Sequence, residues 1–134
     1  KLLGEYYAKY YHEYHHLPVV ILRIFNSYGP GERPGQYRNV VPNFLWRAMH
    51  NKPLIIYGTG DETRDFNWVG NAVQALLLAA TKKEAIGETF NVGSGEEVRI
   101  IDLAKTVFKV IGKPENIIKR SAGHGTPYCA GNPT

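Results

Sequence analysis

The sequence predicts an α/β fold, in which strands and helices alternate along a chain of 134 residues. Residues 19–25 (VVILRIF) are β-branched and almost continuously apolar, which is typical of a strand buried on both faces in a parallel sheet. Residues 99–111 repeat apolar side chains at the spacing of an amphipathic helix. The chain contains too few such strands to complete a parallel sheet. We therefore interpret it as the second part of a larger α/β protein.

The first half of the sequence predicts a helix, the strand at 19–25, a loop and a second helix. Residues 2–16 carry aromatic and aliphatic side chains at helical spacing, and Pro18 disfavours helix at the residue before it. The loop at 26–39 is rich in glycine and proline, and it is long enough to suggest a function. The second helix is expected from Val41 or Pro42 to His50, because proline is tolerated in a first turn.

The second half predicts shorter strands and two further helices. Strands are expected at 54–58 and 66–69, with a turn at 59–65 between them, and a helix at 71–82 follows. A strand at 88–95 runs into a glycine turn, and Gly112 and Pro114 close the helix at 99–111. Residues 116–120 are a candidate last strand. Residues 1–119 are thus expected to form the folded unit, and 120–134 an irregular tail.

The composition favours a folded cytoplasmic protein, with 43% hydrophobic and 21% charged residues. The longest nearly apolar run, residues 72–81, has about half the length of a membrane-spanning helix, and no secretion leader opens the sequence. The single cysteine, Cys129, cannot form an internal disulfide, which fits a reducing compartment. The net charge of +4 comes from scattered basic residues, so we expect a small phosphorylated ligand and neither nucleic acid nor membrane as a partner.

Residues 12–16 (HEYHH) match the H-E-x-x-H pattern of zinc peptidases. His12 and His16 lie one helical turn apart with Glu13 between them, as zinc chemistry requires. Against this, the expected helix ends directly after His16, and no second helix offers an obvious third ligand. The tyrosines that crowd this helix are more typical of a packing or subunit-contact surface. A zinc peptidase is therefore the least favoured hypothesis, and we expect no metal site.

Five segments together resemble the extended short-chain dehydrogenase/reductase family, in its NAD-dependent sugar-nucleotide epimerase/dehydratase branch. In order they are KLLGE, VVILRIFNSYGPGERPG, RNVVPNFLWRAM, PLIIYGTGDETRDFNWV and ETFNVGSGEEVRIIDLA, and they span most of residues 1–104. The resemblance implies the C-terminal part of a Rossmann-type doubly wound sheet plus the smaller substrate-binding subdomain. It implies a protein similar to UDP-glucose 4-epimerases, with a UDP-, dTDP- or GDP-sugar as substrate.

The resemblance places Lys1 at the lysine of the family's catalytic Tyr-x-x-x-Lys, with the tyrosine four residues upstream. In the family, the tyrosinate takes a proton from a sugar hydroxyl while NAD accepts a hydride. The lysine lowers the tyrosine pKa and binds the nicotinamide ribose. The Gly-rich dinucleotide loop is also missing from these residues, so NAD or NADP would be bound mostly by a preceding half. The isolated chain is expected to be inactive.

The resemblance also assigns residues in the loop that follows the strand at 19–25. Phe25 and Tyr28 would border the nicotinamide, and Asn26 would hydrogen-bond the substrate. Asn39, which opens the next helix, sits where family members contact the diphosphate or the base, and helix N-termini favour anions in any case. Asn26 has the alternative of capping a turn, and Asn39 that of capping its helix.

Further along the chain, the resemblance assigns Tyr57 to the base and Arg64 to the diphosphate, as a forked, always-charged donor. Arg64 has the alternative of a surface ion pair with Asp61 or Glu62. Asp65, the next residue, is expected to orient its loop rather than to do chemistry.

Two positions depart from the family pattern. Gly70 and Asn71 replace an acidic pair at the start of a helix, although Asn71 is still able to cap that helix. Arg120 matches an arginine that holds ribose and phosphate, but the following SAGHG lacks the aspartate of the relatives.

The expected partners follow from these interpretations: a homodimer, or association with a missing half. A rival hypothesis is a non-catalytic module that associates with itself or with a partner, because the apolar strand and the tyrosine-rich helix are surfaces that need cover.

Overall fold

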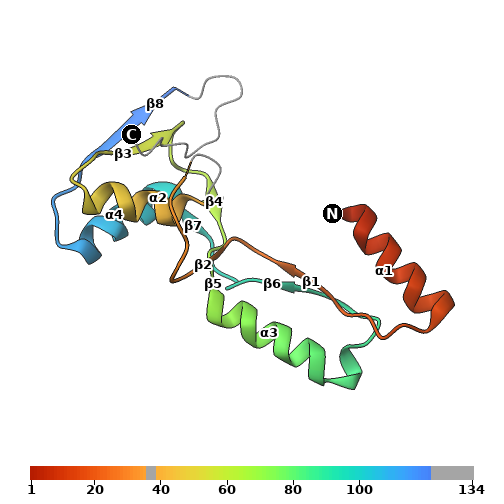
Figure 1. Cartoon of the computed structure of the whole chain (residues 1–134). Helices are drawn as coiled ribbons and strands as arrows, with labels where there is room; N and C mark the ends of the chain where they lie inside the picture. The colour runs from red at the N-terminus through yellow and green to blue at the C-terminus, as the bar shows by residue number, and fades with distance from the viewer. Residues whose placement is uncertain (36–38, 122–134) are drawn as a thin grey trace.

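The computed structural model describes residues 1–35 and 39–121 and confirms the α/β class (Figure 1). Its elements in order are α1 (Leu2–His15), β1 (Ile21–Ile24), β2 (Ser27–Tyr28), α2 (Val40–Met49), β3 (Leu54–Tyr57), β4 (Thr63–Arg64), β5 (Asn67–Trp68), α3 (Val69–Thr81), the 3₁₀ helix η1 (Lys83–Ala85), β6 (Thr89–Val92), β7 (Val98–Arg99), α4 (Ile100–Ile111) and β8 (Ile117–Arg120). None of the described helices is long and apolar enough to cross a membrane.

The strands form four pairs, each of which joins segments far apart in the sequence. The pairs β1–β6, β2–β5 and β3–β8 are parallel, and β4–β7 is antiparallel. Parallel pairing brings the carboxyl ends of β1 and β6 together, and likewise those of β3 and β8. Ligand-binding loops of open α/β sheets usually leave from such ends.

The hydrophobic core lies where α2 and α4 pack on the β3–β8 pair (Figure 1). Phe44 of α2, Leu54 and Ile56 of β3 and Ala104 of α4 are almost completely buried. Burial of a side chain the size of Phe44 stabilises the fold by about 1.5–3 kcal/mol. Gly112 ends α4 in the left-handed conformation with φ of 71°, as the sequence predicts.

The opposite end of the molecule is thinly packed. There α3 lies along the β1–β6 pair, and α1 lies at the end of the molecule away from α2 and α4 (Figure 1). None of the residues of α1, all of which the structure describes, is buried. This end therefore leaves apolar and aromatic side chains exposed.

The expectation that residues 19–25 are buried on both faces is wrong for this chain. The strand itself is present as β1, but Ile24 and Phe25 are 40% and 42% exposed. Among the described residues β1 pairs with β6 alone, so its second edge has no neighbouring strand. Burial of this strand on both faces requires helices packed on each face, and within residues 1–35 and 39–121 α3 lies on the β1–β6 pair while α1 buries none of its residues.

Several boundaries differ from those predicted. The loop at 26–39 contains β2, the turn at 59–65 contains β4, and β7 and η1 were not predicted. Helix α3 begins at Val69 with Trp68 as its N-cap, so Asn71 is not the cap but a first-turn residue whose Nδ2 lies 3.3 Å from Asn67 Oδ1. Strand β8 extends to Arg120, where we expected the tail to begin, and residues 122–134, including Cys129, lie outside the described residues.

Candidate functional site

The loops that follow β1 and β4 meet at the carboxyl ends of β1 and β6. Phe25 N donates to Val92 O at 2.9 Å, which continues the β1–β6 pairing past Ile24. The side chain of Asn26 donates from Nδ2 to the carbonyl of Asp65 at 3.0 Å, and Asn67 N donates to Asn26 O at 3.1 Å. Asn26 therefore joins two loops instead of only capping a turn. Its contact lies one residue from Arg64.

The carboxylate of Asp65 holds the turn that follows β6. Its Oδ1 accepts from Ser94 N at 2.8 Å and from Ser94 Oγ at 2.7 Å, and its Oδ2 accepts from Gly95 N at 3.0 Å. The hydrogen bonds from the backbone and hydroxyl of Ser94, followed by that from Gly95, lower the pKa of Asp65. The carboxylate of Asp65 thus fixes the turn after β6, whereas the sequence suggested that it orients its own loop.

The guanidinium of Arg64 is exposed and little engaged. Its Nη1 donates to the carbonyl of Thr63 at 2.7 Å, and within the described part of the chain its other N–H donors have no acceptor. The alternative of an ion pair with Asp61 or Glu62 is not what the structure has, because Asp61 faces Arg99 instead. Arg64 therefore presents a fork of N–H donors that is available to an anion.

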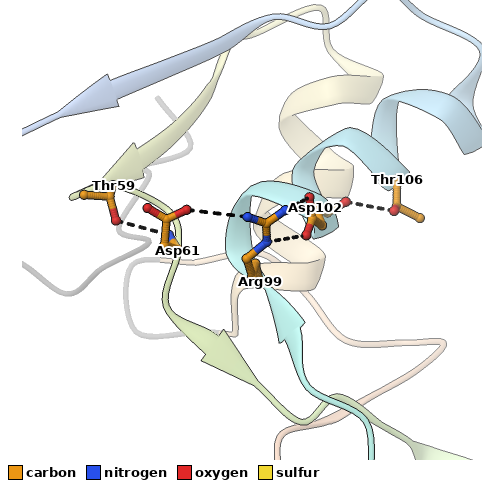
Figure 2. A network of polar contacts seen from close by, with 5 residues as sticks. All are labelled: Thr59, Asp61, Arg99, Asp102 and Thr106. Atoms are coloured by element: carbon orange, nitrogen blue, oxygen red, sulfur yellow. Dashed lines mark hydrogen bonds and ion pairs between the residues drawn. The ribbon is translucent and has the colours of Figure 1, made fainter.

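A network of polar contacts fixes the chain just before Arg64, as Figure 2 shows. Arg99 donates to both carboxylate oxygens of Asp102, at 2.7 Å and 3.1 Å, and its Nη1 lies 3.8 Å from Asp61 Oδ1. The pKa of Arg99 is raised by its hydrogen bond to Asp102. Asp61 N donates to Thr59 Oγ1 at 3.2 Å, and Thr106 Oγ1 donates to Asp102 O at 2.8 Å. The turn at 59–61 is thereby attached to the first turn of α4.

The backbone at the start of α4 completes this attachment. Ile100 N donates to Glu62 O at 3.0 Å, and Ile101 N donates to Gly60 O at 2.9 Å. These two amides are orphan donors of a helix N-terminus, and the loop carbonyls satisfy them. Gly60 has φ of +84°, and a Cβ there would lie 3.2 Å from Ile101 Cβ, so glycine permits the close approach.

Asn39 stands at the N-cap position of α2, but its side chain turns away from the helix. Its Nδ2 donates to Ser27 O at 3.2 Å and to Glu32 Oε1 at 2.8 Å. The alternative of a side-chain helix cap is therefore not what the structure has. Asn39 instead holds the loop after β1 against the start of α2.

Asn43, which the sequence analysis missed, shapes the same loop. It is buried in α2, and its amide binds both backbone groups of Gly35: Gly35 N donates to Oδ1 at 2.9 Å, and Nδ2 donates to Gly35 O at 3.0 Å. The available signal was a polar residue within the apolar stretch VVPNFLW. A buried amide with such partners satisfies backbone that would otherwise lack hydrogen bonds.

Tyr57 and Arg120 are brought together as neighbours on the β3–β8 pair. They are partners in its register, and Gly58 N donates to Arg120 O at 2.9 Å. Tyr57 and Arg120 are the last residues of their strands. Arg64 follows Gly58 by six residues in the sequence. The structure therefore places these two residues at one edge, as a binding site requires.

The residues expected on the cofactor side have separate surroundings; they are Lys1, Phe25 and Tyr28. Glu5 accepts two hydrogen bonds from Arg23, at 2.9 Å and 2.6 Å, which hold the first turn of α1 against β1. Lys1 is the exposed N-cap residue of α1, and its carbonyl accepts from Glu5 N at 3.2 Å. Tyr28 instead packs its ring edge-on against Trp68, at a centroid distance of 5.6 Å.

One histidine of the H-E-x-x-H pattern in α1 has a structural role. His12 Nδ1 lies 2.7 Å from Leu17 O, within hydrogen-bond distance. Across residues 1–35 and 39–121, no three His, Cys, Asp or Glu side chains are arranged to hold a metal ion. The pattern thus lacks a third ligand in the described part of the chain.

Comparison with known proteins gives a consistent group of relatives. The family model described as the NAD dependent epimerase/dehydratase family matches residues 1–93. A UDP-N-acetyl-alpha-D-glucosaminuronate decarboxylase of Bacillus cytotoxicus is 37% identical over 102 residues, which cover 76% of this chain and 32% of that protein.

Solved structures agree with this match. An epimerase of Methanothermobacter thermautotrophicus has a TM-score of 0.87 and 42% identity over 93% of this chain and 38% of its own. A UDP-glucuronic acid 4-epimerase of Bacillus cereus, solved with UDP-glucuronic acid and NAD, has a TM-score of 0.82 and 32% identity, and the match covers 97% of this chain and 40% of that one. The chain therefore spans well under half the length of these relatives.

Proposed function

The chain belongs to the NAD dependent epimerase/dehydratase family, and on this premise we propose that it forms the nucleotide-sugar-binding part of an NAD-dependent nucleotide-sugar epimerase or dehydratase. In this proposal the substrate is a UDP-, dTDP- or GDP-sugar. Its diphosphate contacts Arg64 and Arg120, its base lies beside Tyr57, and its sugar is hydrogen-bonded by Asn26.

The observation that carries the proposal is the state of Arg64. Its guanidinium is exposed and donates to no carboxylate among the described residues, while the chain on both sides of it is fixed by hydrogen bonds. A charged donor on a preorganised backbone is suited to a diphosphate, because little ordering remains to be done on binding. Arg99, by contrast, is neutralised by Asp102.

The second part of the proposal concerns cofactor binding and catalysis. The 134 residues contain neither the family's Tyr-x-x-x-Lys in full nor its Gly-rich dinucleotide loop. We therefore infer that NAD or NADP is bound largely by other residues, and that the isolated chain does not catalyse the reaction. Lys1, Phe25 and Tyr28 are the residues we assign to the cofactor side.

The experiment uses a hybrid enzyme in which this chain replaces the matching segment of the Bacillus cereus UDP-glucuronic acid 4-epimerase. Calorimetric titrations of the hybrid with NAD and then with UDP-glucuronic acid, UDP-glucose, dTDP-glucose and a GDP-sugar should show tight binding of at least one nucleotide sugar. The isolated chain should bind UDP without turning over any of them. Failure of the hybrid and of the chain to bind any nucleotide would overturn the proposal.

A second candidate function, a self-associating or partner-binding module, is favoured by the exposed helix α1. Leu3, Tyr7, Tyr10 and Tyr14 recur at helical spacing along one side of it, and each is about half exposed or more. Contiguous exposed apolar surface of this kind marks an interaction site. A homodimer is compatible with both candidates, and a monomer at all accessible concentrations would count against the second.

A further inference from the structure

Asp65 joins three segments of the chain that are far apart in sequence. Its carboxylate accepts hydrogen bonds from Ser94 N, Ser94 Oγ and Gly95 N, at 2.8 Å, 2.7 Å and 3.0 Å. Its backbone carbonyl accepts from Asn26 Nδ2 at 3.0 Å. The loop after β1, the loop after β4 and the turn after β6 therefore meet at one residue.

Gly93 lets the chain pass close to the carboxylate of Asp65. A Cβ on Gly93 would collide with Asp65 Oδ2, and it would also lie 2.8 Å from Phe25 Cδ2. The backbone at Gly93, directly before Ser94, therefore lies against both Asp65 and Phe25.

We propose that Asp65 is a positioning residue for nucleotide-sugar binding, which fixes Arg64 and Asn26 relative to each other across the two loops. This inference rests on the function proposed above, since it assigns ligand contacts to those two residues. Asp65 acts through them and does not touch the ligand.

The hydrogen bonds of Asp65 favour a positioning role over that of a general base. Both carboxylate oxygens already accept donors, two of which are backbone amides that cannot move away without breaking the turn. These bonds lower the pKa of Asp65, so the carboxylate is a poorer proton acceptor than an ordinary aspartate. Orientation is the role that remains.

Asp65→Asn tests the proposal with a side chain of the same shape. An amide presents an NH₂ group in place of one oxygen, so at least one of the donors from Ser94 and Gly95 loses its acceptor. Ser94→Ala is the milder second variant, because it removes the hydroxyl donor and keeps the backbone bond. In calorimetric titrations of the full chain with UDP, we expect Kd to rise about tenfold for Asp65→Asn and about threefold for Ser94→Ala.

Glu96→Gln is the matched control, since it removes one negative charge from the exposed part of the same turn. Coulomb interaction alone predicts that loss of a negative charge strengthens binding of an anionic diphosphate. The proposal predicts the opposite sign for Asp65→Asn and little change for Glu96→Gln. The direction of the change in Kd therefore separates positioning from simple electrostatics.

A spectroscopic measurement checks the same point without ligand. The side-chain amide signals of Asn26 in ¹H–¹⁵N NMR spectra should shift in Asp65→Asn and stay in place in Glu96→Gln, with circular dichroism confirming that each variant is folded. If the wild-type chain binds no UDP, the proposed function itself fails. If the wild type binds UDP and Asp65→Asn binds it equally well or more tightly, the positioning role alone is wrong.

Discussion

At the scale of single residues, Arg64 carries the most direct expectation. Hydrogen bonds to charged groups contribute about 1.5–3 kcal/mol, so Arg64→Met should weaken UDP binding by about tenfold or more. Arg64→Lys keeps the charge but loses the planar fork, and we expect it to recover only part of the affinity. Titration calorimetry measures both variants. Lys83→Met, a loss of the same charge on η1, is the control, and an equal loss of affinity there would show that only net charge matters.

Arg120 and Lys119 offer a second comparison on one strand. They are successive residues of β8, so their side chains point to opposite faces of the strand. Arg120→Met should raise the Kd for UDP, whereas Lys119→Met should leave it within about twofold of the wild type. The same titration checks both. Equal effects would place the nucleotide away from the face that carries Arg120.

The lowered pKa of Asp65 makes a prediction about stability and pH. A carboxylate with a folded-state pKa below its unfolded value stabilises the fold above that unfolded value, and this contribution is lost as the pH falls through the folded pKa. Thermal unfolding should therefore show that the stability of Asp65→Asn falls less than that of the wild type when the pH is lowered from neutral to strongly acidic. Glu5, whose pKa is lowered by its hydrogen bond with Arg23, contributes in the same direction and remains in both proteins. An equal fall in stability with pH in the two proteins would contradict a lowered pKa of Asp65 in the folded chain.

Contacts between residues far apart in the sequence were not predictable. Asp65 was expected to orient its own loop, but its carboxylate binds Ser94 and Gly95, which follow 29 and 30 residues later. The contact of Arg99 with Asp61 joins residues more than a quarter of the chain apart, and no local pattern indicates it. The two hydrogen bonds between the side chain of Asn43 and the backbone of Gly35 likewise depend on how the loop folds back on α2.

At the scale of elements, the end of α2 depends on one lysine. Lys113 Nζ donates to Ala48 O and Met49 O, both at 2.9 Å, and to Asn51 Oδ1 at 2.7 Å. A cation there satisfies terminal carbonyls and complements the negative end of the helix dipole. We expect Lys113→Met to lower the free energy of unfolding by about 1–2 kcal/mol in urea denaturation.

Lys105→Met is the matched control for that prediction, since Lys105 lies on the exposed face of α4. Its substitution should change the free energy of unfolding by less than about 0.5 kcal/mol. Equal stabilities of the Lys113 variant and the wild type would show that water replaces the three hydrogen bonds without cost.

The long elements were predictable, and of the two-residue strands only β5, within the strand expected at 66–69, was predicted. The helix α4 follows from its apolar spacing and its closing glycine, and α2 from the proline in its first turn. The strands β2, β4 and β7 are too short to show any periodicity, and they exist because of the partners they meet. The burial of β1 was wrongly predicted for a related reason: burial depends on the elements that pack on the strand, not on the apolar stretch alone.

At the scale of the whole molecule, the exposed surface of α1 predicts self-association. Tyr7 and Tyr14 are 60% and 69% exposed on one side of the helix, and burial of such rings is favourable. Sedimentation analysis should show a concentration-dependent dimer of the chain, which Tyr7→Glu weakens by placing a charge in the contact. Lys9→Glu, which puts the same side chain elsewhere on α1, should leave the dimer intact. A monomer at every concentration would contradict this expectation.

The central claim is that Asn26, Tyr57, Arg64 and Arg120 surround one nucleotide sugar, although they lie on or next to three separate strand pairs. The measurement that tests it most directly is an NMR titration of the ¹⁵N-labelled chain with UDP-glucuronic acid, UDP-glucose, dTDP-glucose and a GDP-sugar, since Asn26 is assigned to the sugar. The account predicts that the backbone or side-chain N–H signals of all four residues shift together with a single Kd, and that those of α3 do not. Shifts confined to other parts of the chain, or separate affinities for Asn26 and Arg120, would contradict it.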